Sequence, residues 1–186
     1  MRLGLGLLAL AAVLVIAPQD ALARRCGGVS MPASVEVDGQ TLVLNGMGIR
    51  EATVFSLDVF VAGLYLPATS TDGDAIIRGR GLKRLVLRFV RAVPRDGLAS
   101  GLNDAFGPSL AGQITRFTAM LPAELTEGTV ITLTYRPDAG LEVQVGGRLR
   151  GVISGDAFAG AFFRFLIGPN PPNRGLKRGL LGGQCG

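Results

Sequence analysis

The sequence contains no histidine among its 186 residues. This absence excludes serine or cysteine nucleophiles that depend on a histidine base, and it excludes most zinc sites. We therefore expect no metal and no cofactor. Any catalysis would have to rest on arginine, lysine, tyrosine, threonine or carboxylate side chains.

Cysteine is also scarce, since Cys26 and Cys185 are the two in the chain. In an oxidising compartment they either form a disulfide that joins the two ends of the mature chain or remain unpaired thiols. The sequence leaves both alternatives open. Neither alternative gives these cysteines a catalytic role.

A concentrated basic region is absent as well, although the net charge is +5. Such an excess gives weak attraction to anionic lipids, carboxylates or nucleic acid. The arginines are spread along the chain and are not interleaved with aromatic residues. We therefore expect no nucleic-acid groove.

The first 23 residues form a unit of their own. Arg2 precedes an apolar stretch over residues 3–16, and residues 21–23 read Ala-Leu-Ala. This order is typical of a cleavable secretory signal peptide rather than a membrane span. We expect a signal peptide over residues 1–23, one compact domain over 24–186, a periplasmic or secreted location, and no membrane span after cleavage.

Residues 57–66 are expected to be the central strand of the domain. From Val59 onward nearly every residue is apolar, with β-branched and aromatic side chains and no proline, which favours a strand covered on both faces. Residues 34–44 predict a hairpin that turns at Asp38-Gly39. Between the two, Gly46 and Gly48 predict a tight turn or a bulge.

The remaining pattern alternates strands and helices. Asp72 can cap a short helix through Ile77, and residues 82–93 predict a strand in which Arg88 either faces the interior or reaches water at the sheet rim. A helical region over residues 94–121 is broken at Gly107-Pro108. Residues 130–135, 141–145 and 148–153 predict a meander.

A final helix begins at Asp156 and carries Phe158, Phe162 and Phe165 at helical spacing. This stripe is first of all a core face, and secondarily a pocket wall. The order of elements predicts an α+β fold in which helices pack against an antiparallel sheet.

Three sequence motifs taken together resemble the bacterial chalcone-isomerase-like proteins. They are the Gly-Met-Gly-Ile-Arg segment at residues 46–50, the apolar strand at residues 59–66, and a C-terminal part with Phe-Leu-Ile-Gly at 165–168, Asn-Pro-Pro-Asn at 170–173 and Leu-Lys-Arg-Gly-Leu-Leu at 176–181. The resemblance covers residues 28–182. It implies an open-faced β-sandwich, with a large antiparallel sheet, a layer of helices on one face and a ligand cleft between them.

Members of this family either cyclise a chalcone to a flavanone or bind a fatty acid, and the resemblance implies one of these two activities for this chain. The arginine that matches Arg50 steadies the anionic substrate, or holds the fatty-acid carboxylate together with a tyrosine. This sequence departs from the enzymes: Phe60 stands where they have a catalytic threonine, and Phe165 and Leu166 replace a polar or small pair. Such changes favour binding over cyclisation.

We therefore expect an exported, non-catalytic binding protein for a long apolar carboxylate such as a fatty acid. The head group would lie at Arg50, shared with Tyr65, and the tail along the rings of Phe60, Phe158, Phe162 and Phe165. A buried arginine needs an anion to offset its desolvation, and a carboxylate matches its geometry.

Three alternatives remain open. Arg50 could instead form a structural ion pair with Asp58 or Glu51. The protein could be a chalcone-isomerase-type intramolecular lyase. It could also act through a protein partner, about which the sequence says nothing.

Overall fold

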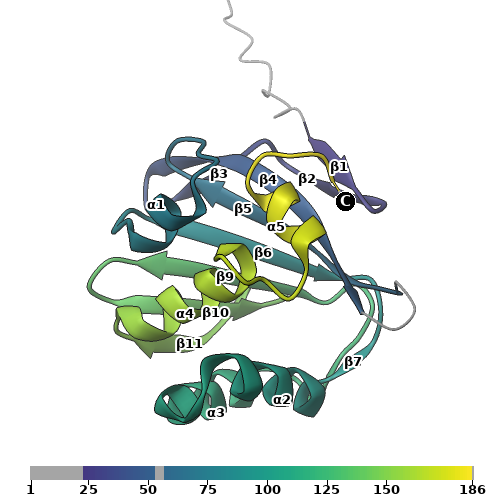
Figure 1. Cartoon of the computed structure of the whole chain (residues 1–186), viewed down its shortest axis with the longest axis vertical. Helices are drawn as coiled ribbons and strands as arrows, with labels where there is room; N and C mark the ends of the chain where they lie inside the picture. Colours follow the sequence, from purple (N-terminus) through teal and green to yellow (C-terminus); the bar gives the residue numbers. More distant parts are fainter. Residues whose placement is uncertain (1–22, 53–56, 186) are drawn as a thin grey trace, which may run out of the picture.

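The computed structural model describes residues 23–52 and 57–185, and the expected signal peptide lies outside this part of the chain except for its last residue. A curled antiparallel sheet of seven strands forms the centre, in the order β11-β10-β9-β6-β5-β4-β3 (Figure 1). Its strands are β3 (Ser34–Val37), β4 (Gln40–Ala52), β5 (Leu57–Leu66), β6 (Lys83–Phe89), β9 (Val130–Arg136), β10 (Gly140–Val145) and β11 (Arg148–Ser154).

The helices lie together on one side of this sheet (Figure 1). They are α1 (Gly73–Arg78), α2 (Arg95–Phe106), the short 3-10 helix η1 (Pro108–Leu110), α3 (Ala111–Ala119), α4 (Asp156–Ile167) and α5 (Arg174–Leu180). The predicted α+β class, with an antiparallel sheet and a helical layer on one face, is confirmed. Within the described residues, no helix has both the length and the apolar character needed to cross a membrane.

Two small sheets complete the fold. β1 (Arg24–Cys26) pairs with β2 (Val29–Met31), and β7 (Val93–Pro94) pairs with β8 (Glu124–Leu125). The β1-β2 hairpin packs on the face of the large sheet that the helices leave uncovered, where Val29 and Met31 join Met47, Val61 and Tyr65 in one buried cluster.

The predicted central strand is confirmed as β5, which lies inside the sheet between β4 and β6. Phe60 and Leu64 belong to the large core under the helices, whereas Val61 and Tyr65 belong to the cluster under β1 and β2. Both faces of β5 are therefore buried. This explains why its sequence is apolar without the alternation of a half-exposed strand.

The tight turn expected at Gly46 and Gly48 is wrong, whereas the bulge is confirmed. β4 runs without a break through both glycines, and its register against β5 shifts at Asn45. A Cβ atom at Gly46 or Gly48 would overlap the backbone of α5. The glycines therefore let helix α5 lie directly against strand β4.

Other sequence predictions are confirmed, apart from the end of one strand. The carboxylate of Asp72 accepts the backbone N–H of Ala75 at 2.9 Å and so caps α1. The helical region breaks at Gly107, which has a φ of 73°. The predicted strand from residue 82 ends earlier than expected, at Phe89, and Arg88 is exposed.

Candidate functional site

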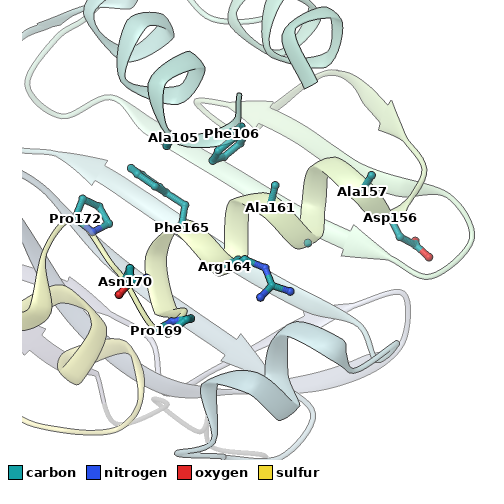
Figure 2. A pocket seen from close by; sticks show the side chains of 11 residues that line it. Ala105, Phe106, Asp156, Ala157, Ala161, Arg164, Phe165, Pro169, Asn170 and Pro172 are labelled. Carbon is teal, nitrogen blue, oxygen red and sulfur yellow. The ribbon is translucent and has the colours of Figure 1, made fainter. Parts of the chain in front are cut away.

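A pocket of about 720 Å³ lies between the end of α2 and the outer face of α4 (Figure 2). Most of its wall is apolar, and the polar side chains are those of Asp156, Arg164 and Asn170. The apolar lining consists of Ala105, Phe106, Ala157, Gly160, Ala161, Phe165, Pro169 and Pro172. A largely apolar hollow of this size with a few polar groups is the usual form of a small-molecule site.

The pocket rests on a cluster of phenylalanine rings. Phe106 of α2 meets Phe158, Phe162 and Phe165 of α4 edge-on, with ring centroids 5.8, 6.2 and 5.8 Å apart. Phe158 and Phe162 are buried in the core, also against Phe117, whereas Phe165 is half-buried and lines the pocket. Of the three α4 phenylalanines predicted to contact a ligand, Phe165 therefore lies at the pocket surface and the other two lie behind it.

Arg50 lies elsewhere on the helical face, near the end of β4, opposite Phe60 in the strand register. Phe60 is buried and packs on Phe89, with ring centroids 5.5 Å apart. Neither Arg50 nor Phe60 is part of the pocket lining. The structure thus brings Arg50 and Phe60 together but places them away from the α2-α4 pocket.

The side chain of Arg50 is half-buried, and this burial lowers the pKa of its guanidinium. Its Nη1 donates to the backbone carbonyl of Glu51. Among the ion pairs formed by the described residues, none joins Arg50 to Asp58 or Glu51. The structural ion pair considered for Arg50 is therefore not observed.

Tyr65 is not placed beside Arg50. It lies on the other face of the sheet, in the cluster under β1 and β2, where its hydroxyl donates to the carbonyl of Pro32 at 3.0 Å. Burial raises its pKa to about 12, with a smaller opposing effect from Arg84. The strand alternation of β5 sends Phe60 and Tyr65 to opposite faces, so the structure does not support a head group shared by Arg50 and Tyr65.

A lysine that the sequence analysis did not single out is buried beside α1. The Nζ atom of Lys83 donates to the backbone carbonyls of Ile76, at 2.9 Å, and Gly79. It also lies 4.6 Å from the ring centroid of Tyr135 and 5.5 Å from that of Phe163. Burial lowers its pKa to about 8, and the nearby charge of Asp156 opposes this effect. Lys83 therefore satisfies carbonyls at the end of α1.

The two cysteines are joined in the structure. Cys26 of β1 and Cys185 form a disulfide with a Cα–Cα distance of 5.5 Å, across 159 residues of sequence. The bond ties the N-terminal hairpin to the segment that follows α5, at the top of the view in Figure 1.

The part of the chain that the structure describes contains no group of three or more histidine, cysteine or acidic side chains that could hold a metal ion. The groups available for recognition in the pocket are therefore an apolar wall, one arginine, one amide and one carboxylate. This set can bind and orient an amphipathic molecule. Two of these residues were not among the predicted site residues. Phe106 lies in the helical region expected over residues 94–121, and Arg164 interrupts the phenylalanine-rich sequence of α4.

Among curated proteins, no sequence matched this chain significantly. Among solved structures, an Arabidopsis thaliana fatty-acid binding protein is similar, with a TM-score of 0.70 and 17% sequence identity over 90% of this chain and 95% of that one. At this identity the likeness establishes the fold. A sequence profile described as chalcone isomerase-like matches residues 23–182, which is most of the chain. The chain therefore belongs to the chalcone isomerase-like family.

Proposed function

We propose that the protein binds a long apolar carboxylate, such as a fatty acid, in the pocket between α2 and α4. The observation that carries this proposal is the apolar wall of that pocket, formed around Phe106 and Phe165 in a hollow of about 720 Å³. The similarity in fold to a fatty-acid binding protein supports the same ligand class. The expected signal peptide supports a role in the periplasm or outside the cell, which N-terminal sequencing of the mature protein would test.

The tail of the ligand supplies most of the binding energy in this proposal. Burying one methylene group contributes ~0.8 kcal/mol, and a chain that is only half covered gains about half as much. Affinity should therefore rise about two- to fourfold per added methylene until the pocket is filled. Ordering the chain costs part of this gain.

A single tryptophan can report on this pocket, because the natural sequence has none. We propose Phe106→Trp, which places an indole in the pocket wall, titrated with saturated acids of increasing chain length. The expected result is a saturable change in emission whose midpoint falls as the chain lengthens. Ala139→Trp is the matched control, since Ala139 is exposed in the turn between β9 and β10 and should report no binding.

A second variant blocks the pocket. Ala161 lies on the pocket floor, and Ala161→Trp fills the space that the tail would occupy. We expect calorimetric titration of this variant to show binding at least about tenfold weaker than in the wild type, a loss comparable to that of two buried methylenes. If no chain length binds to the wild type, or if Ala161→Trp binds every acid as well as the wild type does, the proposed site is wrong.

The head-group role expected for Arg50 stays a prediction. Arg50 has no carboxylate partner among the described residues, which is compatible with an incoming anion. It does not line the α2-α4 pocket, however, and this argues against contact with a ligand bound there.

A further inference from the structure

The floor of the pocket is one stripe of helix α4. The residues that line it, Ala157, Gly160, Ala161, Arg164 and Phe165, recur at intervals of three and four positions and therefore share one face of the helix. At about 1.5 Å per residue, the stripe from Ala157 to Phe165 is roughly 12 Å long. The small side chains lie at its beginning, and the cation and the ring lie at its end.

Opposite charges mark the two ends of this stripe. Asp156 stands at the start of α4, and Arg164 stands in its last turn (Figure 2). The carboxylate of Asp156 already has partners: it accepts the hydroxyl of Tyr135 at 3.0 Å and pairs with Arg80 at 3.2 Å. The negative end of the pocket is therefore satisfied within the protein.

Arg164 differs in this respect. Within residues 23–52 and 57–185, its guanidinium takes part in no ion pair. It is also not needed at the end of its helix, because Lys177 of α5 already donates its Nζ to the carbonyl of Gly168, the residue that caps α4, at 2.8 Å. The pocket thus has a positive end whose charge is not matched by an acidic partner.

We infer that Arg164 receives the carboxylate of the ligand and that the tail runs from there along α4 towards Ala157, beneath Phe106. This inference rests on the proposed function and adds the polarity of the bound molecule. A guanidinium can donate two parallel hydrogen bonds to a carboxylate, which fixes orientation as well as adding energy. The reversed orientation would place the ligand carboxylate beside the carboxylate of Asp156, and the repulsion between these like charges disfavours it.

The test compares a long-chain acid with its methyl ester on four proteins: the wild type, Arg164→Gln, Arg50→Gln and Arg150→Gln. Arg150 is the matched control, since it is an exposed arginine of β11 outside the pocket lining. We expect Arg164→Gln to weaken binding of the acid about tenfold, equivalent to ~1.4 kcal/mol, and to leave the ester unchanged. Arg150→Gln should leave both affinities unchanged, and Arg50→Gln distinguishes Arg164 from the other predicted position of the head group.

Two further measurements sharpen the result. Because Arg164 is exposed, the advantage of the acid over the ester should shrink as salt is added. Arg164→Lys keeps the charge and should restore part of the preference for the acid. Thermal melts of the Arg164 and Arg150 variants should coincide with that of the wild type, since an exposed arginine without an acidic partner contributes little to folding.

The outcomes separate this inference from the proposal on which it rests. If acid and ester both bind and Arg164→Gln leaves the preference for the acid intact, the inference is overturned while the binding function stands. If Arg50→Gln removes the preference instead, the head group lies at Arg50 and the inference is likewise overturned. If neither acid nor ester binds to the wild type, the proposed function itself fails.

Discussion

Replacing the buried Lys83 with methionine should change how the stability of the protein depends on pH. The ammonium of Lys83 is bonded to two backbone carbonyls at the end of α1 and lies over the rings of Tyr135 and Phe163. The residue is only 5% exposed. Methionine has a similar length and no charge, so it can fill the same space without the cost of burying an ion.

The sign follows from the direction of the pKa shift. Burial lowers the pKa of Lys83 from 10.5 to about 8, so between these pH values the unfolded chain binds more protons than the folded protein does. Stability contributed by this group therefore rises with pH across that window. At ~1.4 kcal/mol per pH unit, the cost of the buried charge is up to ~3 kcal/mol near neutral pH and falls by about 2 kcal/mol between roughly pH 7.5 and 9.5. The carbonyls and rings favour the charged form and should reduce this change.

Urea unfolding at several pH values across this window measures the effect. We expect the wild type to gain ~1 to 2 kcal/mol relative to Lys83→Met as the pH rises. The comparison cancels the contributions of other groups, including the tyrosines, which titrate at higher pH. Parallel stability curves for the two proteins would refute the reasoning, because they would mean that Lys83 keeps its ordinary pKa in the folded state.

Three further predictions concern other parts of the molecule. Thiol titration of unfolded, unreduced protein should find no free thiol, and finding two would contradict the disulfide. Gly179→Ala should destabilise the protein by ~1 to 3 kcal/mol in urea unfolding, because its Cβ would overlap the carbonyl of Met47. The control Gly101→Ala, in the open middle of α2, should stabilise the protein by ~0.5 to 1 kcal/mol. Equal effects of the two substitutions would show that α5 can move away from β4. The protein should not accelerate chalcone cyclisation, since Phe60 occupies the position where the family resemblance implies a catalytic threonine, and turnover that depends on Arg50 would overturn this expectation.

Most of the fold could be predicted because its signals are local. The Asp38-Gly39 turn is formed by two residues with positive φ, 52° and 76°, and both belong to types that tolerate this conformation. The phenylalanine spacing of α4 indicated its buried face without knowledge of what covers it. Such patterns depend only on residues within a single turn or helix.

The errors arose where distant segments meet. Gly46 and Gly48 fit a turn as well as they fit a close contact, and the contact is made by α5, about 130 positions later in the sequence. Lys83 is buried only because the carbonyls at the end of α1 face it. The spacing of Phe158, Phe162 and Phe165 could not reveal which ring reaches the pocket, since this depends on where α2 packs.

The bond between Cys26 and Cys185 makes the chain nearly circular, since it closes a covalent ring across 159 positions. In the chain-entropy view, a ring of this size restricts the unfolded state by up to ~5 kcal/mol. Any single cut of the backbone inside the ring, for example at the exposed Asp138-Ala139 turn, leaves one covalent molecule whose pieces separate only after reduction.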